Sequence, residues 1–135
     1  MALLFTLKDG EKIRTRKAEK ASATVIAAGS FVGIDAGGLI ITAVAGTTAL
    51  AYCINGAAAG TTDVEVTTGN DFTLVGTASV VFAKASRGLA CDLTAAQLIN
   101  TAATATSVVK VGISPEAGTV GVAAGVEVRI NKPLF

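Results

Sequence analysis

The sequence predicts a mainly β protein: a small antiparallel β-barrel or sandwich with one short helix and an extended N-terminal arm. Two observations predict the β fold. From Ser22 onward, short segments rich in Val, Ile, Thr and Phe are separated at brief intervals by Gly, Asn and Asp. Charged and apolar residues also alternate in two of these segments. The arm is predicted by charge, because six of the eleven Lys and Arg residues stand in the first twenty positions.

The same texture places the individual strands. We expect strands near Ala23–Ala27, Phe31–Ile34, Leu39–Val44, Ala49–Ile54, Asp63–Thr67, Phe72–Val75, Ser79–Ala83, Val108–Ile113, Thr119–Val122 and Val126–Ile130. Residues that tolerate positive φ stand between several of them, at 35–38, 55–56 and 69–71. These intervals suit a single domain, which we expect to span residues 22–135.

Alternation separates two kinds of strand. Asp63–Thr67 and Val126–Ile130 carry charges on one face and valine or isoleucine on the other, as half-buried antiparallel strands do. The segments 39–41 and 49–52 are instead apolar on both faces, so they should be central or covered by a neighbouring subunit. Under the second alternative, the oligomer interface would contain Leu39, Ile41, Leu50 and Tyr52.

One segment departs from the β pattern. In Asp92–Asn100, the residues Ala95, Leu98 and Ile99 are spaced for one face of a helix, and Asp92 or Thr94 is a suitable N-cap. The sequence therefore predicts a short helix here, packed across one mouth of the barrel.

Composition indicates a thin core. The chain has 135 residues and is 51% hydrophobic, but it contains only five Phe, one Tyr and no Trp. Small side chains bury less area than a Leu or Phe, whose burial is worth about 1.5–3 kcal/mol. Oligomerisation commonly supplies the missing burial. The two cysteines, Cys53 and Cys91, lie in apolar surroundings without metal-type spacing, so we expect buried free thiols.

The uncharged run at 36–62 has to be tested as a membrane span. A span needs about twenty predominantly apolar residues, whereas the strongest part, Leu39–Ile54, is interrupted by Gly46-Thr47-Thr48. Two short strands around that turn explain it better. The apolar stretch at the N-terminus is too short for a signal peptide, so we expect synthesis and folding in a cytoplasm.

Charge sets residues 1–21 apart as an arm. Residues 1–20 carry a net charge of +3, whereas residues 21–83 contain no Lys or Arg and carry −4. A charged leader on an apolar body is typical of a docking segment, and the simpler alternative is a solubilising tail. The basic residues of the leader are Lys8, Lys12, Arg14, Arg16, Lys17 and Lys20.

A protein partner suits this leader better than a nucleic acid. Six cations could neutralise several phosphates, but Asp9, Glu11 and Glu19 are interleaved with them and aromatic residues for base stacking are missing from residues 6–30. Because the leader has little to bury, we expect its deletion to leave the body folded.

Catalytic chemistry has few candidates. The chain contains no histidine, which removes the commonest general base and metal ligand. Asp63 with Glu65 on one strand face, and Asp71 in a turn, are more typical of solvation than of acid–base catalysis. The glycine-rich pieces lack the context of a phosphate-binding loop. We expect a protein that is not an enzyme, with no catalytic residues, metal or cofactor.

Two segments carry a family resemblance. Val109–Val122, followed by Val126–Ile130, resembles the C-terminal strand pair of tailed-phage capsid decoration (cement) proteins, which have a small β-barrel or β-tulip fold. The earlier piece Gly29–Asp35, with the letters GSFVGID, resembles a strand and turn of the same family. The resemblance covers Ala23–Asp35 and Val108–Ile130, which is less than half of the chain.

The resemblance implies a virion protein. It implies a homotrimer on the capsid surface that binds the major capsid protein at junctions between capsomers, with the six basic residues of the leader as the capsid contact. Other functions remain open on the residues alone: another structural component of a particle, such as a fibre base, or a β-barrel that binds a ligand or a nucleic acid.

Overall fold

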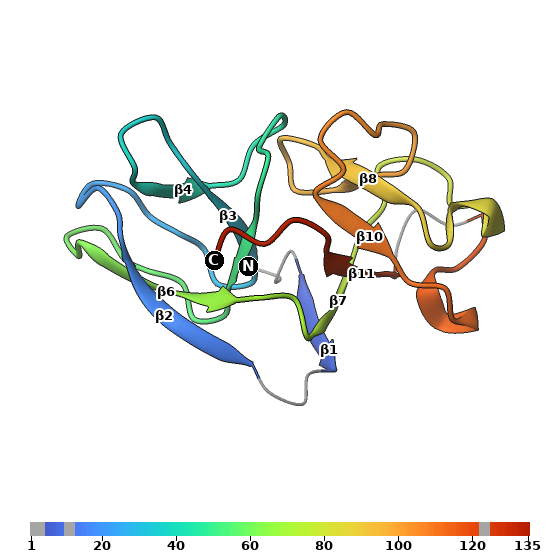
Figure 1. The fold of residues 1–135 in the computed structure, drawn as a ribbon, viewed down its shortest axis with the longest axis horizontal. Coiled ribbons are helices and arrows are strands. Elements are labelled where there is room, and N and C mark those ends of the chain that lie inside the picture. Colours follow the sequence, from blue (N-terminus) through green and yellow to red (C-terminus); the bar gives the residue numbers. More distant parts are fainter. Residues whose placement is uncertain (1–4, 10–12, 122–124) are drawn as a thin grey trace.

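The structure, a computed structural model, describes residues 5–9, 13–121 and 125–135, which are mainly β with antiparallel sheets and contain no α-helix. The elements are β1 (Thr6–Asp9), β2 (Arg14–Glu19), β3 (Ser30–Ile34), β4 (Ile40–Thr42), β5 (Ala51–Cys53), β6 (Asp63–Thr68), β7 (Thr73–Gly76), β8 (Ala90–Leu93), β9 (Ile99–Asn100), β10 (Val109–Val111) and β11 (Val126–Ile130), with 3₁₀ turns η1 (Lys84–Ser86) and η2 (Pro115–Ala117). They form a six-stranded sheet β1-β7-β11-β10-β8-β9, a three-stranded sheet β4-β3-β5 and a pair β2-β6 (Figure 1).

The three-stranded sheet lies between two hydrophobic clusters. Successive side chains of β3 point to opposite faces of the sheet. Phe31 belongs to a first core cluster, which is shared with the six-stranded sheet, and Val32 belongs to a second core cluster, which is shared with β6. In β5, Tyr52 joins the first cluster, while Ala51 and Cys53 join the second. The apolar character of both faces of 49–52 therefore reflects a central position within one chain.

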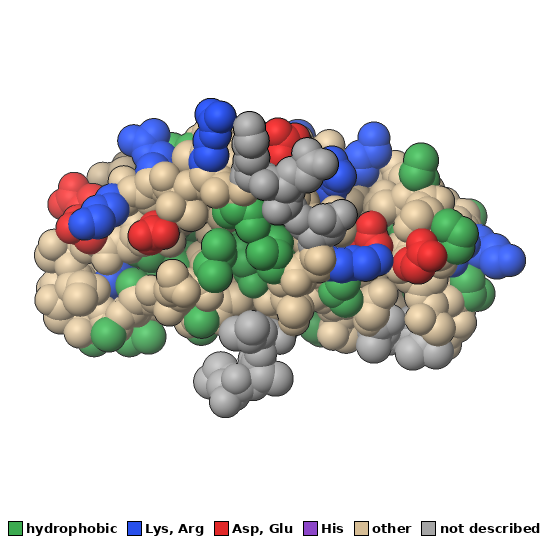
Figure 2. Space-filling view, turned by 90° about the horizontal axis from the view of Figure 1, so that it is seen from below, with side chains coloured by type: hydrophobic (Ala, Val, Ile, Leu, Met, Phe, Trp, Pro, Cys, Tyr) green, Lys and Arg blue, Asp and Glu red, His purple; other side chains and the backbone are tan. Residues whose placement is uncertain are grey.

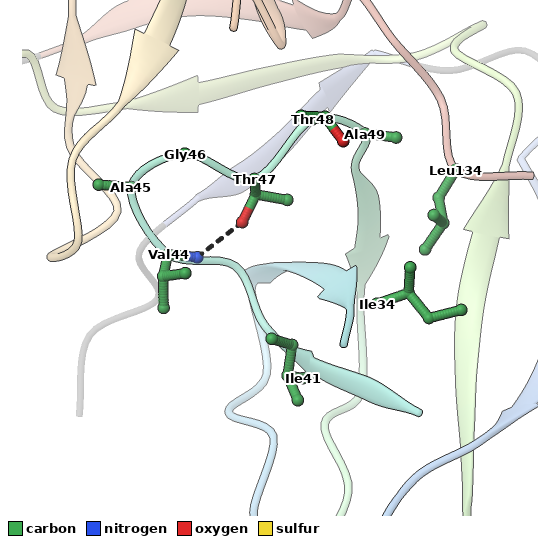
Figure 3. Close-up of a pocket in the computed structure, with 9 residues that line it drawn as sticks. All are labelled: Ile34, Ile41, Val44, Ala45, Gly46, Thr47, Thr48, Ala49 and Leu134. Carbon is green, nitrogen blue, oxygen red and sulfur yellow. Dashed lines mark hydrogen bonds between the residues drawn. The ribbon is translucent and has the colours of Figure 1, made fainter. Parts of the chain in front are cut away.

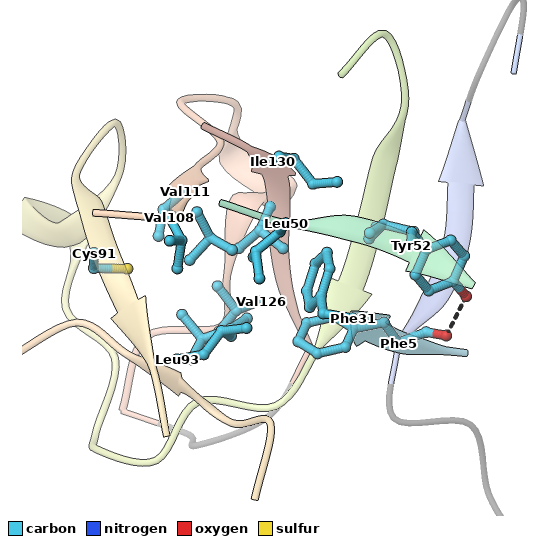
Figure 4. Packing of buried hydrophobic residues seen from close by; sticks show 14 of the residues in the cluster. Phe5, Phe31, Leu50, Tyr52, Cys91, Leu93, Val108, Val111, Val126 and Ile130 are labelled. Atoms are coloured by element: carbon cyan, nitrogen blue, oxygen red, sulfur yellow. Dashed lines mark hydrogen bonds between the residues drawn. The ribbon is translucent and has the colours of Figure 1, made fainter. Parts of the chain in front are cut away.

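Aromatic rings form the centre of the first cluster (Figure 4). The ring centroids of Phe5 and Phe31 are 4.3 Å apart, and those of Phe31 and Tyr52 are 6.0 Å apart. The ring centroid of Phe72 lies 6.3 Å from that of Tyr52. The Tyr52 hydroxyl donates a hydrogen bond of 2.7 Å to the carbonyl oxygen of Phe5. This row joins β3, β5 and the turn before β7 to the N-terminal residues.

A buried glutamine links the two larger sheets. Gln97 lies in the turn between β8 and β9, and its side-chain amide accepts a bond from Phe31 N (2.8 Å) and donates to Phe31 O (2.7 Å). The same nitrogen lies 3.2 Å from the carbonyl oxygen of Ala43. The Gln97 amide therefore bridges the backbone of β3 and the residue that follows β4, where Ala43 N also donates to Phe31 O.

Seven of the predicted strands are present in full or in part, namely those near residues 31–34, 39–44, 49–54, 63–67, 72–75, 108–113 and 126–130. The interpretation of Leu39–Ile54 as two short strands around Gly46-Thr47-Thr48 is confirmed, although β4 and β5 both pair with β3. The predicted strand at Ala23–Ala27 is wrong, since only an isolated bridge between Ile26 and Ala57 forms there. Ser79–Ala83 and residues 119–121 are also irregular, and Val122 lies outside the described residues.

The helix predicted at Asp92–Asn100 is wrong. The segment is a β-hairpin in which Leu93 pairs with Ile99, and Thr94 N donates to Leu98 O at 2.8 Å. The Asp92 carboxylate does not cap a helix; it accepts bonds from the N–H groups of Thr106 and Ser107. Burial opposes ionisation of Asp92, but these hydrogen bonds outweigh it and lower its pKa below the usual value.

The separation of residues 1–21 as an arm outside a domain of 22–135 has to be corrected. β1 pairs with β7 and β2 pairs with β6 along its whole length. Phe5 is fully buried, and its ring lies against Gly76, where no side chain would fit. The leader contributes two strands and a core aromatic residue, so it is part of the folded body.

Both cysteines are free and buried, as predicted. Burial, reinforced by the negative charge of Asp92, raises the pKa of Cys91 to about 12. Burial also raises the pKa of Cys53, which donates its S–H to the carbonyl oxygen of Glu65. Both side chains therefore act as small apolar core residues at neutral pH.

Phe5→Ala should reveal that the leader is structural. We expect the free energy of unfolding to fall by about 3–5 kcal/mol, because a fully buried ring is removed from a packed cluster. Leu7→Ala, two residues further on in β1 and 37% exposed, is the matched control and should cost clearly less. Urea unfolding of the three proteins measures the difference. A Phe5→Ala protein as stable as the wild type would contradict this role.

Candidate functional site

The six basic residues of the leader do not form one patch. β2 presents two faces, because register places Arg14, Arg16 and Ala18 opposite Thr68, Val66 and Val64 of β6, and places Thr15, Lys17 and Glu19 opposite Thr67, Glu65 and Asp63. Lys12 lies outside the described residues. The other five basic residues of the leader therefore lie in several different environments.

Arg14 and Arg16 share the β2 face that carries Ala18. Ala18 and Phe135 pack against the second core cluster, and the Arg16 guanidinium lies 4.5 Å from the centroid of the Phe135 ring. Both arginines remain exposed to solvent. Because a cation on an aromatic face loses side-chain freedom before any partner arrives, the Arg16 guanidinium is held in position.

The opposite face of β2 and β6 is acidic overall. Lys17 stands directly opposite Glu65, and Glu19 stands opposite Asp63, so three carboxylates and one ammonium group share this face. Thr15 Oγ1 donates a hydrogen bond of 2.9 Å to Glu65. Figure 2 shows basic and acidic side chains side by side at the end of the molecule where β2 and β6 lie. This mixture opposes binding of a polyanion on that face.

Two other leader cations are engaged within the chain. Lys8 forms an ion pair with Glu127 of β11. Lys20 is 1% exposed, and its ammonium group donates to the carbonyl oxygens of Ala21 (3.1 Å), Thr24 (2.6 Å) and Thr61 (2.7 Å). The assignment of Lys20 to a docking surface is therefore wrong, because its buried ammonium group spends its three donors on backbone carbonyl groups of the same chain.

The predicted oligomer interface is corrected in part. Leu50 and Tyr52 are buried within the single chain and cannot contact another subunit. Leu50 is enclosed by the C-terminal segment, since its N–H donates to Lys132 O and its carbonyl accepts from Leu134 N. Leu39 and Ile41 remain partly exposed.

Ile41 lines a groove of mixed polar and apolar surface that sequence reasoning did not find (Figure 3). The groove has a volume of about 310 Å³ and is lined by Ile34, Ile41, Leu134 and residues 44–49. Ile34 is 47% exposed and Val44 is 50% exposed. The loop keeps its shape through a bond from Val44 N to Thr47 Oγ1 (3.0 Å), while the Thr47 methyl group lies against Gly33. We call the groove, together with Asp35, the β3–β4 surface.

A second surface lies on β10 and β11 and was also missed. Lys110 and Arg129 stand directly opposite each other across the two strands, and both are exposed. They line a groove of about 440 Å³ together with Gly112, Ile113 and Ser114. Ile113 is 82% exposed. We call this the β10–β11 surface; the separation of its two cations in sequence concealed it.

Other site types find little support. Among residues 5–9, 13–121 and 125–135, no three His, Cys, Asp or Glu side chains are placed to hold a metal ion. Within the same part of the chain, no helix is long and apolar enough to cross a bilayer. No protein-family model, curated protein or solved structure matches this chain.

Lys20→Met and Lys17→Met should separate a structural lysine from a surface one. We expect Lys20→Met to lower the free energy of unfolding by about 1–2 kcal/mol, because three partly buried hydrogen bonds of a buried ammonium group are lost. Lys17→Met, at an exposed position of β2, should change the free energy of unfolding by less than about 0.5 kcal/mol. Equal effects in denaturant unfolding would refute the distinction.

Proposed function

We propose that this protein is a structural virion protein that decorates a phage capsid and stabilises it at junctions between capsomers, as a homotrimer and without enzymatic activity. The two segments that resemble capsid decoration proteins fold as β3 with its turn and as β10 and β11. The layered antiparallel sheets fit a small β-sandwich, which is a suitable rigid body for a particle surface.

The observation that carries this proposal is the exposed strand β2. It displays Arg14, Arg16 and Lys17 to solvent and is anchored at both ends, by buried Phe5 before it and by buried Lys20 after it. A docking strand that is already ordered loses less entropy on binding than a flexible arm.

β2 also offers a free edge. Along Arg14–Glu19, β6 is its only strand partner within the described residues, and beyond it Lys20 makes an isolated bridge to Ile40. An edge of this kind can accept a strand of the capsid protein, and its cations can pair with capsid carboxylates. We therefore place the capsid contact on Arg14, Arg16 and Lys17.

The small free energy of exposed ion pairs favours a contact made by several copies at once. Exposed ion pairs contribute about 0.2–1 kcal/mol each, so three pairs alone give an affinity of about millimolar or weaker. Several copies in one oligomer add an avidity factor of about 10²–10⁴. The exposed apolar side chains of the β3–β4 and β10–β11 surfaces support self-association.

Capsid co-sedimentation tests the proposal. The double variant Arg14→Glu/Lys17→Glu should bind empty capsids, assembled from the major capsid protein of the same phage, at least about tenfold more weakly than the wild type. Arg16 is left unchanged because its guanidinium packs on Phe135. Lys84→Glu/Lys132→Glu, with the same charge change elsewhere, should bind like the wild type.

DNA retention at low and moderate salt is measured in parallel. We expect weak retention, because Lys17 shares its face of β2 and β6 with three carboxylates, those of Glu19, Asp63 and Glu65. Wild-type protein that does not sediment with capsids would refute the proposal. Tight, salt-dependent DNA retention would favour a nucleic-acid-binding module in its place.

A further inference from the structure

The most exposed large apolar side chain of the described chain is Ile113, and the backbone turn that follows it is held by hydrogen bonds. Ile113 lies between β10 and η2, where its Cγ2 atom rests against Gly88. The following turn is held by Arg87, whose Nη2 donates to the carbonyl oxygens of Pro115 (2.9 Å) and Gly118 (3.0 Å). An apolar side chain that is 82% exposed and precedes a hydrogen-bonded turn suits insertion into a partner.

The charges beside Ile113 are unbalanced. Lys110 and Arg129 are cross-strand neighbours of the same sign, an arrangement that is unfavourable without a counter-charge. No described carboxylate is within ion-pair distance of either, and Glu127, on the same surface, is paired with Lys8. The β10–β11 surface therefore combines the protruding Ile113 side chain with two cations that have no acidic partner among the described residues.

The β3–β4 surface has the complementary character. Ile34 and Val44 are half exposed beside a groove, and Asp35 follows Ile34 immediately. The Asp35 carboxylate accepts bonds from Gly37 N and Leu39 N, both 2.9 Å, so its position is fixed while it stays exposed. The sequence between residues 21 and 83 contains no Lys or Arg.

We infer that the β10–β11 surface of one copy docks on the β3–β4 surface of a second copy, with Ile113 in the groove beside Val44 and with Lys110 and Arg129 facing Asp35. The two surfaces are different parts of the molecule: β3 and β4 lie in the left half of Figure 1, and β10 and β11 lie in the right half. A contact between them is head-to-tail, and repetition of it closes a ring or continues as a filament.

A two-fold contact of either surface with itself is disfavoured by charge. It would bring Lys110 and Arg129 against the same pair, or Asp35 against Asp35, and like charges brought together oppose association. The head-to-tail arrangement pairs opposite charges. Closure with three copies rests on the proposed function, whereas the pair of surfaces follows from the structure.

Two charged variants test the pairing. Ile113→Glu removes the apolar side chain that enters the groove, and Val44→Glu places a charge in the groove. Each change should raise the dissociation constant of self-association by about 30-fold or more, as loss of a central contact does. Val25→Glu, at another side chain that is 61% exposed, is the control and should assemble like the wild type. Sedimentation at tens of micromolar measures the masses, and urea unfolding checks that all variants fold.

Mixing the two variants gives the decisive result. The Ile113→Glu chain keeps an intact groove and the Val44→Glu chain keeps the Ile113 side chain, so the mixture should contain a 1:1 dimer that neither forms alone. A wild type that is monomeric, folded variants that assemble normally, or a mixture without the dimer would each overturn the inference. If the dimer forms but the wild type does not bind capsids, the interface stands and the proposed function fails.

Discussion

The environment of Phe31 is the constraint on which the rest of the fold depends. Its ring packs against Phe5 and Tyr52, while its N–H and carbonyl are both bound by the side chain of Gln97. A chain with one Tyr and five Phe has few large side chains to place, and this residue brings the leader, the middle sheet and the β8–β9 turn to one point. Gln97 holds a positive φ of 61°, which is costly for a residue with a side chain and is stabilised by its three buried hydrogen bonds.

The small number of large side chains also explains why the leader is part of the folded body. Phe5 supplies an aromatic ring beside Gly76 of the six-stranded sheet, and the buried Lys20 side chain donates hydrogen bonds to three backbone carbonyl groups. Between these two anchors, β2 is exposed but ordered. The charge that distinguishes the leader in the sequence is thus divided between structural contacts and three solvent-facing cations, which is the basis for placing a capsid contact on a fixed strand.

The sequence predicted those strands and turns that depend on residues close together in the chain. Alternation identified β6 and β11 with their buried valines, and the turn at Gly46-Thr47-Thr48 correctly divided β4 from β5. The hairpin at 90–100 was mistaken for a helix because Ala95, Leu98 and Ile99 have helical spacing, whereas the turn depends on a tertiary partner, the β3 backbone bound by Gln97. No local signal shows that Leu50 is covered by the C-terminal segment or that Lys110 faces Arg129, since both depend on long-range pairing.

Native-state hydrogen exchange tests most directly whether the leader and core form one cooperative unit. The Phe31 amide donates to Gln97 Oε1, and the Lys20 amide donates to Thr62 O at 2.9 Å. If the leader is integral, both amides should exchange only through global unfolding, with the same opening free energy and denaturant dependence. A Lys20 amide that exchanges through a much smaller opening free energy than Phe31 would show that the leader detaches, and would contradict this account.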